Sequence, residues 1–192
     1  MNILFLKTLA MNPSNMTYHS PQKKDFTWQE GIMVAQCEKC AGEGTIGLDC
    51  HCGIYGSPNP KALREYESHP TSFVALLNAY GRVDVWTAPD DIWDCYVLRA
   101  WGARVVAIVA IKDGETIYDI LNGTDDRSMA AIAAVTHFDV PLYPWLKVQE
   151  MIRLTWEEHL QIDPFRASQD DPWQRSGYDW RSNGQLYSVG NV

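Results

Sequence analysis

Four cysteines stand close together in the first third of the chain, in the pattern C-x2-C-x9-C-x-C. Structural zinc takes a tetrahedron of thiolates at about 2.3 Å, and a C-x2-C pair before glycines is typical of the turn that directs two sulfurs to one ion. We therefore predict a structural zinc ion bound by Cys37, Cys40, Cys50 and Cys52. Because only one residue separates the last two cysteines, His51 or His69 is an alternative for one of the four ligands.

Two other interpretations of the cysteines stay open, namely free thiols and a redox-active C-x-x-C pair. A redox pair needs its first cysteine at a helix N-terminus, and Gly42 and Gly44 oppose a helix after Cys40. The fifth cysteine, Cys95, stands in an apolar stretch and is expected to be a core thiol. The odd number of cysteines and the lack of a secretion signal argue against a disulfide framework.

The motifs that would indicate catalysis are missing from the chain. Glu157-Glu158-His159 lacks the second histidine of H-E-x-x-H, and the deaminase signature is absent. The glycines at 42–47 match G-x-G-x-x-G, but they lie within the cysteine cluster and follow no strand. We expect His137 and His159 to be packed or helix-surface residues, and the pairs Asp90-Asp91 and Asp125-Asp126 to serve turns and helix caps. We therefore name no catalytic or cofactor-binding residue and favour a protein that is not an enzyme.

Composition limits the classes of partner. The chain has 192 residues, is 46% hydrophobic and carries a formal net charge of −8. A net negative charge disfavours binding to phosphate backbones, although Lys23, Lys24, Lys39, Lys61 and Arg64 could form a local basic face. No apolar run reaches the ~18 residues of a membrane span, and the N-terminus lacks the basic region of a signal peptide. We expect a cytoplasmic protein that does not bind membranes.

The hydrophobic pattern predicts an α+β fold, with a small antiparallel sheet or open barrel, short helices, a zinc-braced loop region and a C-terminal helix. The expected organisation is an N-terminal segment (1–24), a zinc-braced α+β domain (25–145), a C-terminal helix packed on that domain (146–162) and a polar tail (163–192). Trp173 and Trp180 stand in this tail, where they would either dock on the domain or contact a partner.

Individual helices and strands are predicted from the spacing of apolar residues and from the residues that cap helices or form turns. Residues 11–27 are polar and predict a loop, and residues 37–56 are too rich in glycine for a hydrophobic strand. Residues 1–10 are expected to form a short strand or a floppy terminus. The other expected strands are 31–35, 83–86, 95–101, 104–111 and 116–121, with a bend at Gly102. The expected helices are 61–68, 70–80, 125–138 and 145–161, and Thr124 or Asp125 would cap the third of them. For residues 73–77 a strand is the alternative. Met129, Ile132, Ala133 and Thr136 would form the buried face of the third helix, and Trp145, Val148, Ile152, Trp156 and Leu160 that of the fourth.

The segment Cys50-His-Cys-Gly-Ile-Tyr55, together with Ala62–Tyr66 and Gly81–Trp86, resembles a family of small uncharacterised proteins from actinobacteria and their phages. That family carries C-x-C-G-[IL]-Y, a short helix and a β segment of the form G-x-V-x-L-W-G. The similarity covers about residues 25–145, with Cys40 as an addition and Thr87 in place of a glycine. It implies a phage-encoded scaffold and no activity. Residues 37–44 also resemble the C-x-x-C-x-G-x-G zinc turn of DnaJ-type chaperones, which implies the metal-turn geometry alone.

The function expected from these observations is that of a zinc-stabilised binding protein that acts through contacts with a protein partner. One alternative is a zinc-dependent regulator that binds nucleic acid. A second alternative is an enzyme whose polar groups converge only in three dimensions, for example around Cys95.

Overall fold

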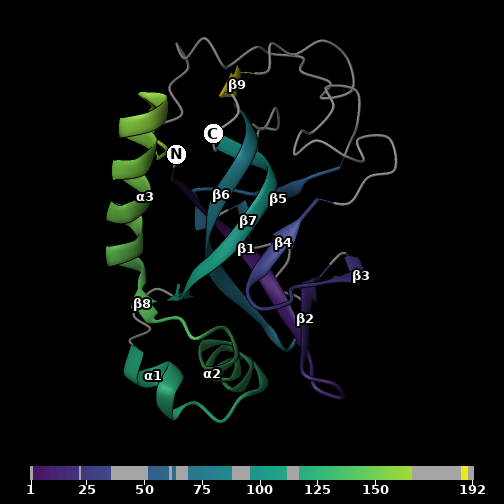
Figure 1. The fold of residues 1–192 in the computed structure, drawn as a ribbon. Coiled ribbons are helices and arrows are strands. Elements are labelled where there is room, and N and C mark those ends of the chain that lie inside the picture. The colour runs from purple at the N-terminus through teal and green to yellow at the C-terminus, as the bar shows by residue number, and fades with distance from the viewer. Residues whose placement is uncertain are drawn as a thin grey trace.

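The computed structural model describes residues 2–21, 23–35, 52–60, 62–63, 69–87, 96–111, 117–165 and 187–189. Along them the strands β1 to β7 precede all the helices, and this segregation confirms the α+β class (Figure 1). In chain order the elements are β1 (Ile3–Asn12), β2 (Thr17–Ser20), β3 (Lys23–Thr27), β4 (Ile32–Val34), β5 (Ile54–Gly56), β6 (Ser72–Thr87), β7 (Tyr96–Ala110), α1 (Ile117–Asn122), α2 (Asp126–Phe138), β8 (Leu142–Pro144), α3 (Trp145–Leu160) and β9 (Tyr187–Val189).

Three long strands, β1, β6 and β7, form the centre of one sheet with the order β3-β2-β1-β6-β7-β4. β1 is antiparallel to β6, from Ile3 opposite Ala79 to Ala10 opposite Ser72. β6 is antiparallel to β7 over almost its whole length. β8 runs parallel to β7, so the sheet is mixed and not purely antiparallel as the sequence predicts.

β5 connects the two sides of this sheet. It pairs with β7, with Ile54 opposite Ala100, and the next residue, Ser57, forms a bridge with Leu6 of β1. The bridge consists of two backbone hydrogen bonds, with N···O distances of 2.8 and 3.0 Å. Backbone pairing therefore runs from β1 through β6, β7 and β5 and returns to β1, so these four strands close into a ring.

β1 is buried on both of its faces. Phe5, Leu6 and Leu9 have no solvent exposure, although side chains of odd and even residues point to opposite faces of a strand. A continuous apolar run is the pattern of a strand covered on both sides. The N-terminal strand predicted from the sequence is thus confirmed, and it lies at the centre of the sheet.

Several local predictions were wrong. Residues 17–20 and 23–27 form β2 and β3 within the stretch expected to be a loop, and β5 lies within the glycine-rich stretch. Residues 72–87 form β6, which confirms the strand predicted at 83–86 but replaces the helix predicted at 70–80 with its strand alternative. A helix-like spacing of apolar residues also suits a strand buried on both faces. Residues 117–122 form α1 where a hairpin strand was expected. The predicted helix at 61–68 lies mostly outside the described residues.

The two later helices agree with the sequence in position. Asp125 caps α2, as predicted, but the buried side chains are mainly alanines, namely Ala130, Ala131 and Ala134, whereas Met129 is 55% exposed. Small side chains let α2 approach the sheet closely, and a search for large apolar residues overlooks such a face. In α3 the predicted stripe is confirmed, since Val148, Ile152 and Trp156 are fully buried.

The bend expected at Gly102 falls instead on the neighbouring strand. β7 continues through Gly102, whereas β6 shifts register between Tyr80 and Val83, where Gly81 has a φ of +71°. No helix in the described ranges is long and apolar enough to cross a membrane.

Candidate functional sites

The predicted zinc ligands fall mainly outside the described part of the chain. Cys37, Cys40 and Cys50 are outside it, and Cys52 lies directly before β5. Cys52 is disulfide-bonded. Within the described ranges, no group of three or more His, Cys, Asp or Glu side chains is arranged to hold a metal ion.

A sulfur in a disulfide is not a thiolate, so zinc binding by Cys52 and the disulfide are alternative states of one atom. The expectation that the chain forms no disulfide does not hold at this position. His51, one alternative ligand, is outside the described residues, and the other, His69, contacts Thr71, with 2.9 Å between Nδ1 and Oγ1.

A buried ion pair lies next to Cys52. Arg99 of β7 stands opposite Asp84 of β6, and its Nε donates to Asp84 Oδ2 at 3.1 Å. The Nε of Arg82 donates to the second carboxylate oxygen, also at 3.1 Å. Asp84 has no solvent exposure and Arg99 only 5%. Both carboxylate oxygens are thus engaged, which fits a structural role better than acid–base chemistry.

Gly53 makes room for this pair. Its φ is +139°, and a Cβ atom built on it would lie 2.5 Å from Cγ of Arg99. The glycine after Cys52 therefore lets the backbone pass directly over the arginine side chain. The pair could not be predicted from the sequence, because Asp84 alternates with Val83 and Val85, and this alternation indicates a solvent-facing carboxylate.

The other side chains considered as functional candidates in the sequence do not come together in one described site. His137 stacks against Tyr18, with 4.8 Å between ring centroids, and His159 Nε2 lies 3.4 Å from the backbone nitrogen of Asn2, so both are packed or surface residues as predicted. Asp125 accepts from Ser128 Oγ at 2.7 Å as the cap of α2. The candidates outside the described residues, or without a described side chain, are Cys95, Asp90, Asp91, Trp173, Trp180, Lys23, Lys24, Lys39, Lys61 and Arg64.

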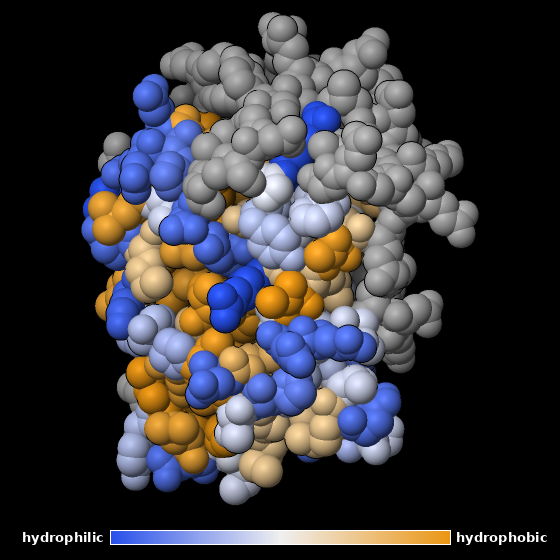
Figure 2. Space-filling view, viewed as in Figure 1, coloured by the Kyte–Doolittle hydropathy of each residue, from blue (hydrophilic) through white to orange (hydrophobic). Residues whose placement is uncertain are grey.

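An exposed apolar surface surrounds α1. Tyr118 and Leu121 of α1 are 72% and 56% exposed, and Leu146 in the first turn of α3 is 79% exposed. α1 contacts both α2 and β8, the strand directly before α3. Figure 2 shows hydrophobic residues at the lower left, where Figure 1 places α1. We call Tyr118, Leu121, Met129 and Leu146 the α1 surface.

Comparison of the chain with models of protein families, with curated proteins and with solved structures finds no match. The function must therefore be argued from the residues themselves.

Proposed function

We propose that this chain is a non-enzymatic binding protein that acts through the α1 surface on a protein partner. The observation that carries the proposal is the exposure of large apolar side chains on a helix of six residues that buries only Ile120. Single exposed apolar residues are ordinary, whereas groups of them mark contact surfaces. Tyr118 adds an aromatic ring of the kind that anchors protein interfaces.

The charges near this surface indicate the chemistry of the partner. Asp125 and Asp126, at the start of α2, are both exposed, and the whole chain carries a net charge of −8. Lys147, beside Leu146, is engaged over the Tyr143 ring, with 3.5 Å between its Nζ and the ring centroid. Complementary charge around an apolar centre guides association and selects partners. The proposed partner therefore presents an apolar ridge with basic residues along its edge.

Zinc is the second part of the proposal. Bound by Cys37, Cys40, Cys50 and Cys52, it would brace the segment between β4 and β5 and hold the buried pair beneath Gly53 in place. The proposal is supported by the ligand spacing, and it requires a compartment such as the cytoplasm, whose reducing conditions keep Cys52 out of its disulfide. Zinc would have a structural role, because four protein ligands leave no open position on the ion.

The test compares surface variants of the full chain. The combined change Tyr118→Gln, Leu121→Gln and Leu146→Gln replaces three of the four apolar side chains of the α1 surface with polar ones while keeping good helix formers. The matched control changes Met16 and Ile32 to Gln, since these side chains are also about half exposed (50% and 44%) but lie elsewhere. Partners captured from the source organism are identified, purified and titrated against each variant by calorimetry.

We expect one purified partner to bind the wild-type chain and the control variant alike, and to bind the α1-surface variant at least about tenfold more weakly. Binding should also weaken as salt is raised, because the edge contacts are ionic. Equal affinity for all three proteins would overturn the proposal. So would sedimentation showing a wild-type dimer that only the α1-surface variant abolishes, because the surface would then join two copies of the chain.

A further inference from the structure

Two histidines lie next to each other at the end of β1, where β2 and β6 pair with it. His19 of β2 stands opposite Ala10 of β1. His69 lies in the turn that leads into β6, whose first residue, Ser72, stands opposite the same Ala10. The two ring centroids are 6.3 Å apart, and the ring planes are at 89° to each other. The pairing of β1 with both neighbours thus brings together two imidazoles that are far apart in the chain.

The hydrogen bond of His19 determines which of its ring nitrogens carries the proton. Nδ1 lies 3.0 Å from the backbone oxygen of Ser20, which can only accept a hydrogen bond, so Nδ1 donates. In the neutral ring Nε2 then has a lone pair, and it has no hydrogen-bond partner in the described part of the chain. His19 is only 4% exposed. An unpartnered polar atom on so buried a residue calls for an explanation, and a bound ligand is one.

His69 adopts the same tautomer through a chain of two hydrogen bonds. The hydroxyl of Thr71 donates its single proton to the backbone oxygen of Met11 at 2.6 Å. Its 2.9 Å contact with Nδ1 of His69 therefore requires Nδ1 to donate. The backbone nitrogen of Thr71 lies 3.4 Å from Nδ1, which is beyond the usual length of a hydrogen bond. Nε2 of His69 likewise has a lone pair and no partner among the described residues.

Two neighbouring lone pairs on nitrogen indicate the chemistry of the ligand. An anion would find no donor on these atoms, and Mg²⁺ and Ca²⁺ prefer oxygen ligands. Imidazole nitrogens suit zinc, nickel and copper. Histidines that bind such metals almost always donate their second ring nitrogen to a fixed acceptor, which sets the tautomer and the orientation of the ring. Ser20 and Thr71 provide such acceptors here.

We propose that His19 and His69 together bind one divalent transition-metal ion of the zinc class through their Nε2 atoms. With Zn–N bonds of about 2.0–2.1 Å, the centroids of two imidazoles on one ion lie roughly 4.5–6.5 Å apart, depending on the N–Zn–N angle. The observed 6.3 Å falls within this range. Two protein ligands leave the other coordination positions to water, so this ion exchanges, unlike one held by four cysteines. The inference does not depend on the proposed function.

The experiment is a titration of the full, reduced chain with Zn²⁺, followed by long-range ¹H–¹⁵N NMR of the imidazole rings and by metal analysis. The variants His19→Gln and His69→Gln each remove one ligand. His159→Gln is the matched control, because it removes an imidazole that lies elsewhere, on α3. Cys52→Ser separates this site from the proposed cysteine site, because it should lower the cysteine-bound zinc and leave the histidine-bound ion in place.

A second pair of variants tests Thr71 as a positioning residue. Thr71→Val removes the hydroxyl that holds Nδ1 of His69 and keeps the branched shape of the side chain, whereas Thr71→Ser keeps the hydroxyl. We expect Thr71→Val to weaken zinc binding by about tenfold or more and to mix the tautomers of His69, because loss of such an outer partner typically costs 10–100-fold in affinity. Thr71→Ser should bind zinc like the wild type.

In the metal-free wild type we expect both rings to carry the proton on Nδ1. Zn²⁺ should then shift the Nε2 signals of both rings together and saturably. His159→Gln should retain this response, and each ligand variant should bind the ion at least about tenfold more weakly. The proposal is overturned if Nε2 carries the proton in either ring, if Zn²⁺ shifts one ring or neither, or if His159→Gln loses as much affinity. It is also overturned if Cys52→Ser releases the ion from the histidines, because His69 would then belong to the cysteine site.

Discussion

Asp84 and Arg99 form an ion pair across β6 and β7 in which both side chains are almost completely removed from solvent. Transfer of two charges from water is costly, and the pair offsets that cost only while its geometry and its additional hydrogen bonds are intact. Arg82 provides such an additional bond to Asp84. The stability of this end of the sheet therefore depends on three charged residues, of which Arg82 and Asp84 are two positions apart and Arg99 comes from the next strand.

Removal of the Asp84 charge should strongly destabilise the fold. In Asp84→Asn the buried Arg99 loses its counter-ion, and we expect the free energy of unfolding to fall by about 3–5 kcal/mol in urea denaturation. Glu150→Gln is the control, because the ion pair of Glu150 with Arg153 is exposed. This variant should leave the urea midpoint of unfolding unchanged. The double variant Asp84→Asn, Arg99→Met should recover part of the loss. Similar midpoints for Asp84→Asn and Glu150→Gln would contradict a structural role for the buried pair.

Tyr80 covers Gly102 on the adjacent strand, and a Cβ atom at Gly102 would lie 2.3 Å from the tyrosine ring. Gly102→Ala should therefore destabilise the wild-type protein by about 1–3 kcal/mol. In a Tyr80→Leu background the same change should be neutral or stabilising, because alanine suits a strand better than glycine does. A thermodynamic cycle of the four proteins measures this dependence. Additive effects would show that the ring does not restrict position 102.

Asp125 should make the stability of α2 depend on pH in the acid range. Hydrogen bonds from the side chain and backbone of Ser128 lower the pKa of the Asp125 carboxyl in the folded protein. The contribution of the cap is therefore complete above the pKa of the unfolded chain, near 4, and is lost as pH falls through the lower folded pKa. Asp125→Ala should cost about 1 kcal/mol at neutral pH, and the difference from wild type should shrink toward pH ~2. Thermal melts across this range check the effect, and a difference independent of pH would contradict it.

Zinc content should depend on the redox state of Cys52. Protein purified under reducing conditions should hold about one zinc per chain and show four thiols that react only after chelation. Oxidation should lower the zinc content, because the disulfide removes a ligand. Cys52→Ser should reduce the zinc content as well, whereas Cys95→Ser should not. Metal analysis with thiol titration distinguishes these states. Metal-free reduced protein with five reactive thiols would exclude the proposed site.

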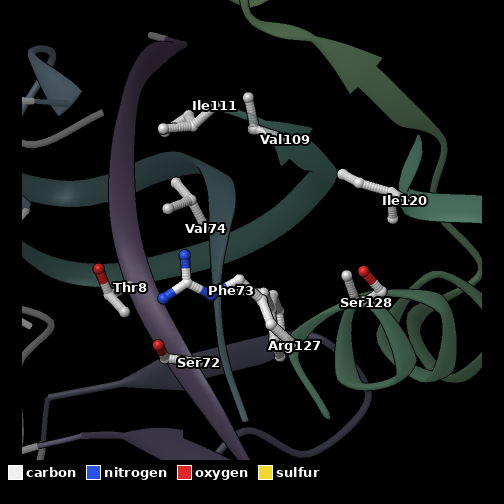
Figure 3. A pocket seen from close by; sticks show the side chains of 10 residues that line it. Thr8, Ser72, Phe73, Val74, Val109, Ile111, Ile120, Arg127 and Ser128 are labelled. Atoms are coloured by element: carbon white, nitrogen blue, oxygen red, sulfur yellow. The ribbon is translucent and has the colours of Figure 1, made fainter. Parts of the chain in front are cut away.

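The sequence predicted elements that carry their own local signals. The Asp125 cap and the proline at position 144 located α2 and α3, and dense β-branched residues located β7. The first half of β6 and the helix α1 were assigned wrongly because short apolar runs suit either state until their neighbours are known. A small cavity between the sheet and α2 is lined by Thr8, Ser72 and Arg127, among others (Figure 3). These residues are far apart in the chain, so no spacing rule could have found them. The cysteines were found because their pattern is local.

The central position of β1 has a consequence for synthesis of the chain. β1 leaves the ribosome before β6 and β7, yet β6 is its main partner. Translation from Asn12 to Ala110 takes several seconds at roughly 5–20 residues per second. During that interval an apolar strand without its partner is exposed to other chains. Lys7 is the single charged residue between Ile3 and Met11, and Thr8 is the only other polar one. Replacement of Lys7 by an apolar residue would therefore favour aggregation of the nascent chain.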